Sequence, residues 1–224
     1  MASFRTHMAF GVAFGVMSAV AIASLAVLPP NWSLSILIGL AVTLGAQLPD
    51  IDSDSGLPFH ITFGSLALSA GGLSLLYAID HYPGDYLLIT VIPLLAIFAV
   101  WVILGTAIKK FTRHRGMAHS LPAAILAGLI TFRLMTWLDF AATQAACLGL
   151  AISLGYTLHL ILDEVWAGMN FHGQLFVPNK AFGSALKLIS HDHKLTVLTY
   201  FAIALMLTLD GQLILTTLNT LVNS

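Results

Sequence analysis

Charge is scarce in this sequence. Only 8% of its 224 residues are Asp, Glu, Lys or Arg, whereas 58% are hydrophobic, and the mean hydropathy is +0.92. A soluble domain of this length needs a polar exterior, so the composition excludes an ordinary water-soluble protein. Nine basic residues are balanced by ten acidic ones, which excludes a strongly basic nucleic-acid-binding protein. We therefore expect an integral membrane protein that contacts membrane lipids and no nucleic acid.

Cysteine is almost absent as well. The single residue of this type, Cys147, lies within an apolar stretch. One thiol cannot form an intramolecular disulfide, and a cysteine-based metal site needs several thiols. Any metal site in this chain must therefore be built from histidine and carboxylate side chains.

Long apolar stretches fill most of the chain. Stretches of roughly 18–25 residues cross a ~30 Å hydrocarbon core as helices. We predict an all-α, polytopic transmembrane helical bundle of about six to seven spans, forming a single integral membrane domain over residues 1–224. Asp210 interrupts the last apolar stretch, so the end of that span is left open. The predicted spans cover residues 8–28, 33–48, 61–79, 86–108, 121–138 and 141–165, with the last starting near residue 195.

Basic residues gather on one side of the predicted bundle. Alternating the spans places the N-terminus, the loops after the second and fourth spans, and residues 166–194 on this side. Basic loops face the cytoplasm in helical membrane proteins, so we expect the N-terminus to be cytoplasmic. Only Arg133 falls toward the opposite side. The basic residues on the predicted cytoplasmic side are Arg5, Lys109, Lys110, Arg113, Arg115, Lys180, Lys187 and Lys194.

The same alternation brings polar groups from five spans to one level. Nothing in the apolar pattern requires this, and ionisable groups at membrane level are costly and usually functional. We therefore predict a metal site at the cytoplasmic ends of the helices. The candidate ligands are His7, Asp50, Asp52, His114, His119, His159 and Asp163.

The sequence HLILD contains the simplest ligand pair. His159 and Asp163 are four residues apart and therefore share a helix face. An imidazole and a carboxylate on one face can hold a metal ion together. The alternative is a helix-end aspartate that only hydrogen-bonds to a neighbouring histidine. The position within an apolar span favours the metal-ligand interpretation.

The sequence HRGMAHS has a different geometry. His114 and His119 are five residues apart, which is about 140° around a helix, so they can converge only if Gly116 permits a turn between them. The planar fork of Arg115 suits a phosphate or a carboxylate, and the alternative is a basic anchor on the cytoplasmic side. Ser120 is expected to cap the following helix.

Seven candidates exceed the three protein ligands of a usual catalytic zinc site. Either two ions bind together, which suits phosphoester hydrolysis, or some candidates only support the ligands. Mixed imidazole and carboxylate ligands favour zinc, with manganese or iron as alternatives. In a hydrolase, Asp50 or Asp52 would be the general base and Arg115 would hold an anionic head group. His60 is a weaker ligand candidate, and Glu164 points about 100° away from Asp163.

Four of these features together resemble a known family. His7, PDID at 49–52, HRGMAHS and HLILD occur in this order on alternating spans. In this respect the sequence resembles, over nearly its whole length, the membrane-bound metal-dependent hydrolase family of the YdjM type. The resemblance implies a bacterial inner-membrane protein with metal-dependent hydrolase activity. A more distant likeness to zinc-dependent phospholipases C and P1-type nucleases lacks their N-terminal Trp ligand.

We expect a hydrolase that cleaves an ester or phosphoester of a lipid-like substrate at the cytoplasmic interface. A lipid could present its head group there without leaving the bilayer, and a small soluble phosphoester is the alternative substrate. The rival functions are an ion- or proton-coupled transporter and a scaffold pinned by a structural metal. Transporters usually place such groups near the midplane between repeated halves, and this sequence shows no repeat. The oligomeric state is left open.

Overall fold

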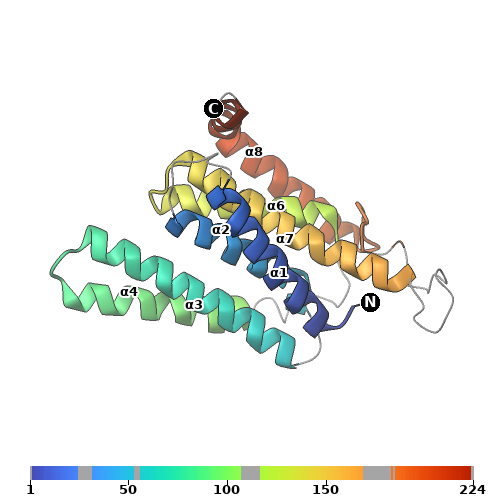
Figure 1. Ribbon diagram of the computed structural model, residues 1–224, viewed down its shortest axis with the longest axis horizontal. Helices are drawn as coiled ribbons and strands as arrows, with labels where there is room; N and C mark the ends of the chain where they lie inside the picture. The colour runs from blue at the N-terminus through green and yellow to red at the C-terminus, as the bar shows by residue number, and fades with distance from the viewer. Residues whose placement is uncertain are drawn as a thin grey trace. The chain divides into compact units, whose positions relative to one another are not determined.

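The computed structural model describes residues 2–24, 32–52, 56–106, 117–168, 183 and 185–222 (Figure 1). Over these residues the chain forms seven α-helices and no strand, which confirms the predicted all-α class. Six helices are long and apolar enough to cross a membrane, and α6 is apolar but shorter. The helices are α1 (Phe4–Ser24), α2 (Trp32–Gly45), α3 (Gly56–His81), α4 (Tyr86–Phe98), α6 (Leu121–Trp137), α7 (Ala142–Gly168) and α8 (His193–Val222).

Two shorter helical pieces refine the predicted spans. The 3-10 turn η1 (Leu48–Asp52) follows α2, and the π-helical segment η2 (Ala99–Leu104) follows α4. The predicted span 86–108 therefore contains two kinds of helix rather than one. Helix α8 runs through Asp210 without a break and reaches Val222, so the last span does not end at that residue.

The chain divides into two compact units. The first contains Met1–Pro49 and Gly116–Ser224, and the second contains Asp50–Arg115. In the second unit α3 and α4 form a helical hairpin, in which Gly71 gives room for the side chain of Ile97. The prediction of a single domain stays a prediction.

Helix α7 is the central helix of the first unit. It packs against α1, α2, α6 and α8, and its buried residues run from Ala145 to Gly168. His159 and Asp163 are among them. The HLILD pair therefore lies inside the helix bundle and not on its surface.

Glycines let these helices pack backbone against backbone. Gly15 of α1 lies against Gly39 of α2, and Gly155 of α7 lies against the carbonyl oxygen of Val42 in α2. A Cβ atom at any of these glycines would collide with the neighbouring helix. Close approach through small residues is how helices associate in lipid, where burial of apolar side chains gives little driving force.

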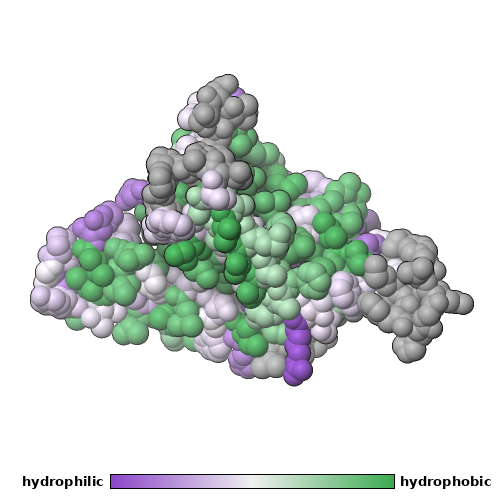
Figure 2. Space-filling view, in the orientation of Figure 1, coloured by the Kyte–Doolittle hydropathy of each residue, from purple (hydrophilic) through white to green (hydrophobic). Residues whose placement is uncertain are grey.

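Outward-facing side chains of the helices are largely apolar. Figure 2 shows hydrophobic residues over much of the visible surface. Examples from the first unit are Val16, Leu150 and Phe201, each at least half exposed. Such a surface suits contact with lipid acyl chains.

An ion pair joins α6 to α8. Nη1 of Arg133 donates a hydrogen bond of 2.5 Å to Oδ1 of Asp210. Asp210 is only 4% exposed, whereas Arg133 is 53% exposed. The sequence predicts Arg133 toward the side of the membrane opposite the other basic residues. Asp210 balances the positive charge of Arg133 at that position.

Gly155→Ala should lower the free energy of unfolding by about 1–3 kcal/mol, the usual cost of overpacking. The added methyl group would separate α7 from α2. Gly211→Ala is the matched control, because no atom lies within 4 Å of a Cβ at that helical position. Thermal unfolding in detergent measures both, and equal stability of the two variants would contradict the close α2–α7 contact.

Asp210→Leu should destabilise the protein, because it leaves Arg133 without its counter-charge. The loss should be smaller than the roughly 3–5 kcal/mol typical of a fully buried pair, since Arg133 is half exposed. The double variant Arg133→Leu/Asp210→Leu should recover much of the stability. If the single and double variants unfold at the same temperature in detergent, the ion pair contributes nothing to the α6–α8 contact.

Candidate metal centre

Four ionisable side chains meet inside the first unit. They come from α1, from the residues just before α6, and from α7, and each is at most 2% exposed. Ionisable groups are rarely buried among apolar side chains unless they pair with one another or bind a metal. The four residues are His7, His119, His159 and Asp163.

His159 is oriented by a backbone carbonyl group. Its Nδ1 lies 2.8 Å from the carbonyl oxygen of Ala46, and this hydrogen bond requires a proton on Nδ1. In the neutral ring the lone pair is then on Nε2. Metal-binding histidines are commonly held in this way, with one nitrogen donating to a carbonyl and the other facing the ion.

The position of Ala46 follows from the packing of α2 on α7. Gly45 lies against the carbonyl oxygen of Ile152, and a Cβ atom at this position would collide with it. The end of α2 therefore comes close enough to α7 for the Ala46 carbonyl to reach the His159 ring. The local sequence thus sets the orientation of His159 through glycine and not through a polar side chain.

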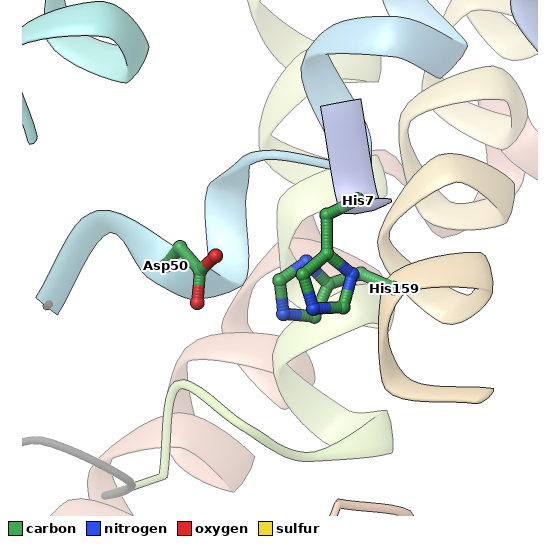
Figure 3. A group of neighbouring side chains, drawn as sticks. All are labelled: His7, Asp50 and His159. Atoms are coloured by element: carbon green, nitrogen blue, oxygen red, sulfur yellow. The ribbon is translucent and has the colours of Figure 1, made fainter. Parts of the chain in front are cut away.

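His7 stacks on His159. The ring centroids are 3.6 Å apart and the ring planes differ by 10° (Figure 3). His7 Nε2 also lies 3.1 Å from Asp163 Oδ1. When Nε2 donates the proton in this contact, the neutral ring has its lone pair on Nδ1. That nitrogen has no hydrogen-bond partner among the described residues.

Asp163 is held through one of its two oxygens. Oδ1 accepts from His7 and from the backbone N–H of Ala2, at 3.1 and 3.2 Å. Oδ2 has no hydrogen-bond partner in the described part of the chain and lies 3.9 Å from His159 Nε2. A buried carboxylate oxygen left in this state costs free energy, which a metal ligated by Oδ2 would offset.

Two contacts position His119 at the start of α6. Ser120 accepts a hydrogen bond of 3.3 Å from the N–H of Ala123, which confirms its predicted role as the helix cap. The hydroxyl group of Tyr156 donates to the carbonyl oxygen of Ala118. Tyr156 lies one turn before His159 on α7, so the central helix fixes both histidines.

Three of these residues could hold a metal ion together. One ligand atom from each of His119, His159 and Asp163 lies within 4.8 Å of the others. Two imidazoles and one carboxylate are a usual protein ligand set for catalytic zinc, and they leave a fourth position for water or substrate. The chemistry and the orphaned Oδ2 atom both fit a divalent ion.

Four further predicted residues are not part of this three-residue set. Asp50 is half-buried on η1, where Figure 3 labels it, and it opens the second unit directly after Pro49. The side chain of Asp52, and the whole of His114 and Arg115, lie outside the described residues. The ligand or base roles of these four residues stay predictions.

Two weaker candidates have other contacts. His60 stacks on Trp101 within the second unit, with ring centroids 5.7 Å apart. Glu164 accepts hydrogen bonds from the backbone N–H groups of Gly183 and Ala185. Its offset of about 100° from Asp163 had indicated that it points away from the site.

Sequence reasoning missed the supporting contacts of Tyr156 and Ala46. Tyr156 could have been found, because it precedes His159 by three residues and so shares its helix face. Ala46 could not have been found from the sequence, because it contacts His159 through its backbone carbonyl group and not through its side chain.

Comparison with known proteins identifies the family. The model of the YdjM inner membrane protein family matches residues 1–222, and these include all four motifs described above. No curated protein and no solved structure matches the chain. The family resemblance drawn from the motifs is confirmed, as is an integral membrane location. The family description names a membrane and not an activity.

Zinc should bind the purified protein and be lost from His119→Ala and His159→Ala. Each substitution removes one of three ligands, so affinity should fall by more than about tenfold, the minimum typical even of supporting residues. Elemental mass spectrometry of detergent-purified protein after dialysis against zinc measures the content per chain. His81→Ala is the control, since His81 is the exposed last residue of α3 in the second unit. Retention of zinc by both site variants would contradict the ligand set.

Proposed function

The chain belongs to the YdjM inner membrane protein family, and from this premise we propose that it is a membrane-embedded, metal-dependent hydrolase. The proposed substrate is an ester or phosphoester of an amphiphilic, lipid-like molecule. The reaction takes place where α1 and α6 begin and α7 ends. The basic loops at these helix ends support a cytoplasmic orientation.

The observation that carries the proposal is the buried set of His119, His159 and Asp163. A structural zinc site is normally closed by four protein ligands, whereas three leave a position for the reaction. When bound, a divalent ion supplies Lewis-acid activation of water and of the scissile bond. Zinc fits this mixed ligand set, with manganese or iron as alternatives.

The residues of the chain hold this set in place before substrate arrives. Ala46 fixes the ring of His159, and Ala2 with His7 fixes the carboxylate of Asp163. Ligands locked by such contacts need little rearrangement during the reaction. Asp50 or Asp52 would act as general base and Arg115 would bind an anionic head group, as the sequence predicts.

The location of the site favours a lipid-like substrate. His7 lies in the first turn of α1, and His119 lies two residues before α6 begins. Both positions are close to helix ends, at the level where a lipid head group meets water. The apolar outer surface of the helices would let the tail of the substrate stay in the bilayer. A small soluble phosphoester is the alternative substrate.

An ion-coupled transporter is the second candidate, and the Arg133–Asp210 pair favours it. A buried carboxylate in a membrane helix is a common feature of ion pathways. Arg133 lies twelve residues into α6, about 18 Å from the start of that helix. The pair is therefore well separated from the histidine cluster, and we give the hydrolase precedence.

Hydrolysis should depend on metal and on His119. The assay incubates zinc-loaded protein in detergent with a phospholipid, a polyprenyl phosphate and a soluble phosphate monoester, and measures released phosphate or alcohol. Turnover of a lipid-like substrate should fall at least about a hundredfold in His119→Ala and remain in His81→Ala. Metal-loaded protein that cleaves none of these, but carries ions across proteoliposomes, would establish the transporter instead.

A further inference from the structure

A non-helical segment connects to the start of α8. Residues 185–192, here called the linking segment, have the sequence ALKLISHD and form bends without regular helix. In the sequence, this segment belongs to the connection at residues 166–194 on the predicted cytoplasmic side. Its apolar residues have no role in the proposed chemistry.

The backbone of the linking segment is bound on its inner side. The N–H of Ala185 donates to Glu164, and the carbonyl oxygen of Lys187 accepts from the N–H of Leu121 at 3.2 Å. The hydroxyl group of Tyr200 donates to the carbonyl oxygen of Leu188 at 3.1 Å. Backbone polar groups that bond to the protein do not need water, so such a segment can lie where water is scarce.

The apolar side chains of the segment point outward. Leu186 is 39% exposed, Leu188 57% and Ile189 63%, whereas Ala185 and Ser190 are buried. Removing large aliphatic side chains from water is energetically favourable. A segment with a bound backbone and projecting aliphatic side chains is typical of membrane-interface contact.

The charges around the segment suit a lipid surface. Asp192 is engaged as the cap of α8, where it accepts from the N–H groups of Lys194 and Leu195 at 3.1 Å each. Lys194, His191 and His193 are exposed beside it. Basic groups next to projecting apolar residues are attracted to anionic phospholipid head groups.

We propose that the linking segment rests in the membrane interface, with Leu186, Leu188 and Ile189 among the lipid acyl chains. Its partner is the bilayer leaflet on the side where α7 ends and α8 begins. Lys194 lies at the level of the phosphate groups. The linking segment therefore contacts lipid although its composition predicts a loop.

The lipid contact adjoins the loop that carries His119. Leu121, two residues after His119, is bonded to Lys187, and Thr196 contacts the sulfur atom of Met117 at 3.7 Å. On the proposed function, on which this consequence rests, the contact brings lipid directly beside the ligand loop. The contact itself is independent of the reaction.

Spin labels report the depth of the segment directly. Cys147→Ala removes the native thiol, and Ile189→Cys or Leu186→Cys then receives a nitroxide in liposomes of phosphatidylcholine and phosphatidylglycerol. Oxygen gathers in the acyl region, whereas a nickel chelate stays in water. Leu150→Cys on the lipid-facing side of α7 is the lipid control, and the 86%-exposed Asp80→Cys is the water control.

Both segment labels should collide with oxygen more often than the Asp80 label and less often than the Leu150 label, and with nickel several times less often than the Asp80 label. Nickel collisions equal to those at Asp80 at both positions would overturn the proposal. Zinc content measured on the same samples separates the two claims. Labels in water with zinc bound would refute only the lipid contact, whereas labels in lipid without zinc would refute only the metal-dependent hydrolase.

Discussion

The close contact between α2 and α7 is the constraint on which the rest of the site depends. Gly45 and Gly155 let the two backbones approach, and this brings the Ala46 carbonyl to His159. The hydrogen bond sets the proton on Nδ1, so the lone pair of the neutral ring is on Nε2, which could ligate a metal. The orientation of the ligand therefore depends on helix packing, because a wider spacing between α2 and α7 would break the hydrogen bond between Ala46 and His159.

The free-energy cost of buried polar groups explains the other contacts. Asp163 is satisfied on one oxygen by His7 and Ala2, which ties the start of α1 to the end of α7. Its second oxygen has no hydrogen bond within the described residues, and it faces the ring of His159. The second oxygen could therefore bind an additional positive charge such as a metal ion.

Much of the fold was predictable because membrane helices carry a strong composition signal. The spans follow from apolar length, and the convergence of His7, His119, His159 and Asp163 follows from alternating those spans. The partner of Arg133 did not follow, because Asp210 was read as an interruption of the last helix and not as its buried charge. The proposed lipid contact of the linking segment did not follow either, since it depends on which backbone groups are bonded.

X-ray absorption at the zinc edge of the metal-loaded protein tests the central claim most directly, because it reports the atoms that contact the ion. The account predicts imidazole scattering from at least two histidines and nitrogen or oxygen ligands at about 2.0–2.2 Å. The imidazole signal should weaken by one ring in His159→Ala. An all-oxygen shell without imidazole scattering in the wild-type protein would contradict it, since the ion would then be bound outside the His119–His159–Asp163 set.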